Sequence, residues 1–115
     1  MATRREVEAK LRQLIARLSE TQDAQGALAR TLPESKVVAV RVPDLEADYW
    51  TLMESGRMDG LHRGVAERAD IKIRVASDQL VAIVDGKASL FSAFVSGQVK
   101  IEASLSDLMR LRKLT

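Results

Sequence analysis

Residues 70–102 read DIKIRVASDQLVAIVDGKASLFSAFVSGQVKIE. Apolar and basic side chains alternate near the start of this stretch, which predicts a strand over residues 70–76 with one buried and one solvated face. Two short apolar helices are expected next, over residues 79–85 and 89–96, because a glycine follows each segment at the position where helices commonly end. A second alternation predicts another strand over residues 98–103.

The two short helices carry more apolar surface than a single packed face requires. The apolar residues of the first cover about 160° of arc and those of the second about 200°, whereas an ordinary amphipathic stripe covers about 100°. The additional surface needs a second layer of the same chain, a second subunit or an apolar ligand to cover it. The periodicity does not choose among these three. The residues concerned are Leu80, Val81, Ile83, Val84, Leu90, Phe91, Ala93, Phe94 and Val95.

Upstream of this stretch, the pattern predicts helices over residues 1–33. Thr3 and Glu6 form a capping-box signature, and Val7, Leu11, Leu14, Ile15 and Leu18 then make a core-facing stripe. A weaker helix from Asp23 to Leu32 is expected to end at Pro33, because the residue before proline disfavours helical geometry.

Residues 36–76 are expected to supply four strands. The first is the β-branched run 36–42, which ends at Pro43. The second is 48–54, and a turn at Ser55-Gly56 leads into the third over about residues 57–63. The strand at 70–76 is the fourth. The strand at 98–103 is the fifth, and a helix over residues 104–114 follows, capped by Ser104.

This order of elements predicts one α+β domain over residues 1–115, with a single sheet and helices packed against it. The length of 115 residues, with 46% hydrophobic and 30% charged residues, is typical of one globular domain with one core. The N-terminus lacks an export signal and the longest uncharged stretch has about 12 residues against the roughly 20 that span a membrane. We therefore expect a soluble, cytoplasmic protein.

Several classes of function are disfavoured by composition. The chain has no cysteine and one histidine, so thiolate chemistry and multi-histidine metal sites are excluded. The net charge is only +2 and there are four aromatic residues, without the basic stripe and stacking rings of a nucleic-acid binder. His62 lacks an evident nucleophile or orienting acid by spacing, so we interpret it as a structural or surface residue. We expect no catalysis, no metal and no cofactor.

An ordered set of motifs in the C-terminal half resembles the sterol carrier protein type-2 lipid-binding domain family. An aspartate opens a strand at Asp70, a short helix ends in Gly86-Lys87, and an Ala-Phe-x-x-Gly helix covers 93–97. A Lys-Ile strand at residues 100–101 and a leucine-rich helix from Leu105 to Leu114 follow. The likeness is good over residues 70–114 and loose over 36–69. The chain has Ala103-Ser104 where the family usually has a glycine.

The resemblance implies a five-stranded mixed sheet covered by helices, with an apolar tunnel between them. Such a tunnel accepts fatty acids, fatty acyl-CoA, sterols or phospholipids, and the extra apolar arcs would face the ligand. We expect its walls to come from both short helices and the last helix, with Trp50 and Met53 on the sheet side. The helix residues are Leu80, Ile83, Val84, Leu90, Phe91, Phe94, Val95, Leu105, Leu108, Met109 and Leu111.

Two further alternatives remain open on the sequence. Arg110, Arg112 and Lys113 are candidates for docking on an anionic membrane surface, although a solvated helix end would also suit the helix dipole. The same apolar surplus would equally serve a homodimer, or an accessory module that docks on a partner enzyme and delivers its substrate. The sequence does not separate a carrier from such a module.

Overall fold

The computed structural model describes residues 2–20, 35–54 and 57–114, with the backbone alone for 18–20 and 110–114. The helix predicted at residues 23–32 and the side chain of Leu18 lie outside this description. The elements are α1 (Arg4–Glu20), β1 (Lys36–Val42), η1 (Pro43–Leu45), β2 (Ala47–Glu54), β3 (Arg57–Met58), β4 (His62–Arg63), β5 (Ile71–Arg74), α3 (Ser77–Val84), α4 (Leu90–Val95), β6 (Lys100–Glu102) and α5 (Leu105–Leu114).

The strands form a single mixed sheet, as predicted. Its order is β3-β2-β1-β5-β6, and β4 pairs with β2 beside β3. β1 and β5 run parallel, whereas the other paired strands run antiparallel. The α+β class predicted from the pattern is confirmed. β3 and β4 pair with β2, and residues 64–70 then connect β4 to β5, which lies on the other side of β1.

Because side chains alternate along a strand and direct cross-strand partners share a side, the register divides the sheet into two faces. Along β2 every second residue is buried, from Ala47 to Met53. We call this side the helix-covered face; it includes Val38, Val40, Val42, Tyr49, Thr51, Met53, Ile71, Ile73 and Ile101. We call the other side the outer face; it includes Ala39, Arg41, Asp48, Trp50, Lys72, Arg74, Lys100 and Glu102.

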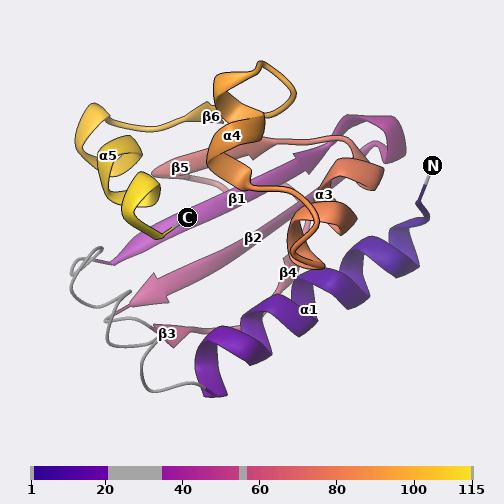
Figure 1. Ribbon diagram of the computed structural model, residues 1–115. Helices are drawn as coiled ribbons and strands as arrows, with labels where there is room; N and C mark the ends of the chain where they lie inside the picture. The colour runs from indigo at the N-terminus through magenta and orange to yellow at the C-terminus, as the bar shows by residue number, and fades with distance from the viewer. Residues whose placement is uncertain (1, 21–34, 55–56, 115) are drawn as a thin grey trace.

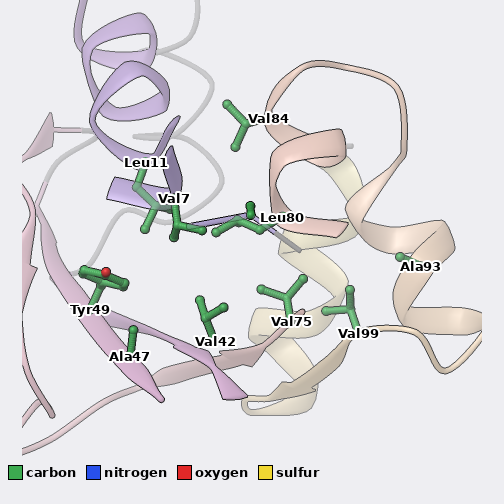
Figure 2. Close-up of a cluster of buried hydrophobic side chains, with 11 residues drawn as sticks. Val7, Leu11, Val42, Ala47, Tyr49, Val75, Leu80, Val84, Ala93 and Val99 are labelled. Atoms are coloured by element: carbon green, nitrogen blue, oxygen red, sulfur yellow. The ribbon is translucent and has the colours of Figure 1, made fainter. Parts of the chain in front are cut away.

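Helices lie on one side of the sheet, with α1 crossing below α3 and α4 in the view of Figure 1. Val7 and Leu11 of α1 meet Leu80 and Val84 of α3 above the covered face, and all four are buried. Figure 2 shows them around side chains that rise from the sheet and the segments next to it, among them Val42 and Tyr49. We call this set the core cluster; it is Ala2, Val7, Leu11, Val42, Ala47, Tyr49, Val75, Leu80, Val84, Ala93 and Val99.

The glycines predicted to end the short helices do so. Gly86 and Gly97 have positive φ values of 78° and 84°, which L side chains resist. After α3 the N–H of Gly86 donates to Ile83 and that of Lys87 to Ala82, and the same two-bond pattern follows α4. Both helices therefore end in Schellman motifs, which satisfy carbonyls that the helix leaves unpaired.

The predicted caps are also present. The backbone N–H of Glu6 donates to Thr3 Oγ1 over 3.2 Å, and that of Asp107 donates to Ser104 Oγ over 3.1 Å. The prediction of one strand over residues 57–63 is wrong, because Gly60 has φ of 121° and divides the segment into β3 and β4. The side chain of Asp59 fills the interruption by accepting the backbone N–H of Leu52 over 2.9 Å.

Candidate functional site

The predicted wall residues divide into groups that have different surroundings. Leu80 and Val84 belong to the core cluster, and Ile83 and Leu90 pack against it. These four side chains therefore hold the helices to the sheet. Their apolar character is accounted for by the protein's own packing.

A second group lies outside the core cluster. Phe91 and Phe94 of α4 and Leu108 of α5 are half-buried, and the two phenyl rings lie 6.0 Å apart, tilted by 53°. Met53 is buried on the covered face but is not part of the cluster. α4 itself is anchored by Ala93, which is a buried member of the cluster. The aromatic pair thus belongs to a helix fixed on the covered side while remaining only partly enclosed.

A third group is exposed. Val95, Leu105 and Met109 have exposed fractions of 71%, 76% and 51%, so these side chains of α4 and α5, here called the apolar rim, face solvent rather than line a wall. Leu105 and Met109 are four residues apart and share one side of α5. The side chains of Leu111 and of the basic residues Arg110, Arg112 and Lys113 lie outside the described part of the chain.

Trp50 and Met53 do not line the same side of the sheet. They are three residues apart in one strand, so their side chains point to opposite faces. Trp50 lies on the outer face, where its ring stacks on that of His62 with centroids 4.1 Å apart and 19° between the planes. The expectation that both residues face the helices is corrected by this register.

One polar pair on the covered side was missed by the sequence reasoning. Lys36 is the cross-strand partner of Met53 and shares its face, and its Nζ lies 3.3 Å from Oδ2 of Asp107. Their side chains are only 15% and 3% exposed. This ion pair ties the start of β1 to the first turn of α5. The sequence could have indicated this position of Lys36, because Lys36, Val38 and Val40 are spaced by two residues and therefore share one face of the strand.

His62, the one histidine of the chain, belongs to a cluster of hydrogen bonds that supports the fold. His62 Nε2 lies 2.9 Å from Asp59 Oδ2, while Asp59 Oδ1 accepts hydrogen bonds from Thr51 Oγ1 and Leu52 N–H. Burial acts to raise the pKa of Asp59, but the bonds from Leu52, His62 and Thr51 outweigh it and hold the pKa below its ordinary value. Thr51 donates to the carboxylate rather than to the imidazole, so this cluster braces a hairpin.

The described residues contain no group of three or more His, Asp or Glu side chains arranged to hold a metal ion. No helix within them is long and apolar enough to cross a membrane.

Solved structures with the same fold cover nearly the whole chain. A UbiJ-SCP2 ubiquinone synthesis protein is 18% identical with a TM-score of 0.67, over 99% of this chain and 92% of that one. Sterol carrier protein 2 like 2 from Aedes aegypti is 14% identical with a TM-score of 0.67, over 97% and 98%. A palmitated form of that mosquito protein also matches, at 9% identity and a TM-score of 0.64, over 98% and 94%.

The chain also resembles one part of a larger protein. The sec-alkyl sulfatase PisA1 from Pseudomonas sp. is 19% identical with a TM-score of 0.61. The match covers 82% of this chain but only 16% of the sulfatase. At these identities the likenesses establish the fold and nothing further.

The family of this chain is established by its sequence and not by the structural likenesses. No curated protein matches it at a significant level. The model of the SCP-2 sterol transfer family, in contrast, matches residues 11–115, which is nearly the whole chain. This chain therefore belongs to the SCP-2 sterol transfer family, a membership that supports binding or transfer of lipids or sterols.

Proposed function

We propose that this chain binds a lipid without catalysis, in an apolar site between the helix-covered face of the sheet and the helices α4 and α5. The ligand class that we infer is a lipid with a long apolar chain, such as a fatty acid, a fatty acyl-CoA or a phospholipid, with sterols as a further class. Transfer of that lipid between surfaces would follow from reversible binding.

The observation that carries this proposal is the half-burial of Phe91 and Phe94. α4 lies over the sheet in Figure 1 and is fixed there by Ala93, yet both aromatic rings fall outside the core cluster. On the opposite layer, Met53 and Ile71 are 4% and 0% exposed, so the protein's own residues already cover them. The apolar surface that stays accessible outside the core cluster is therefore that of α4 and α5, at Phe91, Phe94 and Leu108.

The energetics favour an acyl chain as the occupant. Each methylene removed from water contributes about 0.8 kcal/mol, so a long chain gains affinity without any specific polar contact. An apolar wall discriminates poorly between chain lengths, because one methylene changes binding by only about 1–3 kcal/mol. The palmitated mosquito structure supports the same ligand class.

The proposal is tested by fluorescent fatty acid uptake in two variants of one helix. Phe94→Asp places a carboxylate at the half-buried ring and should abolish uptake, whereas Val95→Asp makes the same change at a side chain that is 71% exposed and should retain it. Circular dichroism of both variants separates lost binding from lost folding. Equal uptake by the two folded variants would contradict the site.

A reporter variant gives a second readout that does not depend on a damaging change. Trp50 is the chain's sole tryptophan and lies on the outer face, so its fluorescence should respond little to a fatty acid. The double variant Trp50→Phe and Phe91→Trp moves the indole to α4, where the same fatty acid should shift its emission. A silent reporter across fatty acids, sterols and phospholipids would count against the proposal.

The exposed apolar rim supports a second function. Val95, Leu105 and Met109 leave apolar side chains in solvent on α4 and α5, which suits a homodimer or docking on a partner enzyme. Analytical sedimentation separates the two functions. A monomer that carries lipid supports the carrier, and a lipid-free obligate dimer supports the interaction module.

Contact with anionic membranes through Arg110, Arg112 and Lys113 is the remaining proposal. Basic residues near a surface of anionic lipid contribute about 1 kcal/mol each. Replacing all three by alanine should weaken co-sedimentation with anionic vesicles and leave fatty acid uptake unchanged. Unaltered vesicle binding by this variant would dismiss the docking role.

A further inference from the structure

A cleft of about 420 Å³ lies on the outer face of the sheet, away from the helices. Its floor is formed by β1, β5 and β6 together with the neighbouring part of β2. One wall is the segment between β4 and β5, through Gly64, Val65, Ala66 and Ala69. The volume lies within the range of small-molecule sites, which is about 300–1,000 Å³. The sheet separates this cleft from the proposed lipid site.

Three cationic residues stand side by side across the floor. Arg41 of β1 is the partner of Arg74 of β5, and Arg74 is the partner of Lys100 of β6. Neighbouring strands lie about 4.8 Å apart, so the row spans about 10 Å. Like charges directly opposite each other destabilise a sheet. The protein therefore maintains an arrangement that its own fold disfavours.

Acidic residues neutralise only part of the positive charge of this row. Arg41 is paired with Asp48, whereas no ion pair joins Lys72, Arg74 or Lys100 to any residue that the structure describes. The cleft is lined by four cationic side chains and two carboxylates, which leaves a net charge of +2. Such a balance matches one dianionic group.

We propose that the outer cleft binds a phosphate monoester carried on a compact apolar group. A phosphate monoester carries close to two negative charges at neutral pH, and guanidinium groups bind its oxygens bidentately. The apolar part would lie against the wall segment, where Val65 is 80% exposed beside two alanines. The cleft's cations and its apolar wall thus match the two parts of such a ligand.

A soluble molecule fits this site better than a membrane surface does. The cations form the floor of a concavity that the segment 64–69 borders, whereas a bilayer presents a flat array of headgroups. The proposal does not depend on a lipid being bound on the other face. The phosphate chemistry is shared by soluble esters and lipid headgroups, so the test includes both.

The experiment titrates phenyl phosphate, and separately inorganic phosphate, into the wild-type chain at constant ionic strength. Backbone amide shifts in NMR spectra should move at Gly64, Ala66 and Arg74, and a thermal shift should show stabilisation. Phenyl phosphate should bind more tightly than inorganic phosphate because of its ring. Fluorescence of Trp50 gives a further readout, since its cross-strand partner Ala39 lines the cleft.

Two variants test whether the row of Arg41, Arg74 and Lys100 binds the phosphate. Arg74→Gln should weaken phenyl phosphate binding at least about tenfold, as expected for a lost charged hydrogen bond. Arg12→Gln removes the same charge from an exposed position on α1, on the covered side, and should leave binding unchanged. Arg74→Gln is itself expected to fold normally, because it relieves repulsion within the row.

Three outcomes would overturn the proposal. The first is the absence of any response to either phosphate beyond the response to chloride. The second is equal binding by the wild type and Arg74→Gln. The third is binding of the wild type to vesicles of anionic phospholipid, lost in Arg74→Gln, without binding of phenyl phosphate; this would assign the cation row to a membrane instead.

Discussion

The two faces of the sheet are built by the same strands and have opposite chemistry. In β5, Ile71 is completely buried under the helices, while the next residue, Lys72, is exposed on the outer face. The covered face is mostly valine, isoleucine, tyrosine and methionine, with Thr51 and Lys36 among them, and the outer face carries arginine, lysine, aspartate and glutamate beside Ala39, Trp50 and Leu52. A period of two lets one short sequence serve both an apolar layer and a charged surface.

The largest expected effect is a difference in stability between variants of Ile71 and of Lys72, which are neighbours in β5. Ile71→Ala should lower the free energy of unfolding by about 2–5 kcal/mol, because it opens a cavity under the helices. Lys72→Ala should change it by no more than about 0.5 kcal/mol, as expected for an exposed side chain. Urea denaturation followed by circular dichroism measures both. Similar losses in the two variants would contradict the division into faces.

The next prediction concerns Lys36, whose cationic side chain lies on the covered side. Lys36→Met should cost about 1–3 kcal/mol, because the buried carboxylate of Asp107 loses this partner. Adding Asp107→Leu should recover much of the loss, since two apolar residues can replace a buried ion pair. Denaturation of the two single variants and the double variant gives the coupling. Strictly additive losses would show that the pair does not act as a unit.

The response to acid provides a smaller effect. Because the pKa of Asp59 is lowered in the folded state, its contribution to stability is present above about pH 4 and is lost as the pH falls through the folded value. The hydrogen bond from Ser77 likewise lowers the pKa of Asp44, and that from Lys10 lowers the pKa of Asp85. The melting temperature should therefore fall between about pH 6 and about pH 3.

Asp59→Asn provides the matched control for the acid response. It removes the titrating group from the hairpin beside Trp50, so its melting temperature should depend less steeply on pH over the same interval. An identical slope in the variant and the wild type would show that Asp59 does not contribute to the acid response.

The smallest effect is expected on the outer face. Without any anion present, Arg74→Gln should leave stability unchanged or raise it by up to about 0.5 kcal/mol, since it relieves like-charge contacts with Arg41 and Lys100. Thermal unfolding in a low-salt buffer free of phosphate measures this. A clear loss of stability would indicate that Arg74 has a structural partner in solution.

The local elements could be predicted from sequence where a local signal specifies them. The alternation at residues 71–75 and the glycines at 86 and 97 determined a strand and two helix ends through their own stereochemistry. The division of residues 57–63 was harder to foresee, because it depends on Asp59 bonding back to the neighbouring strand. The apolar pattern of residues 57–63 does not indicate that Asp59 makes these hydrogen bonds.

The sites were less predictable than the elements, because they depend on pairing between distant strands. The wide apolar arcs of α3 and α4 identified helices on the covered face, but they did not separate core residues such as Leu80 from the half-buried Phe94. Arg41, Arg74 and Lys100 form a row only through the register of β1, β5 and β6. No local pattern in the sequence brings these three residues together.

We propose that a lipid binds on the helix-covered face beside α4 and α5, and native mass spectrometry tests this proposal most directly. The purified chain is measured with and without added palmitate, and its bound material is then extracted and identified. We predict a monomer carrying one lipid, and loss of that lipid in Phe94→Asp but not in Val95→Asp. A chain that stays free of lipid at every palmitate concentration, whether monomer or dimer, would contradict the account.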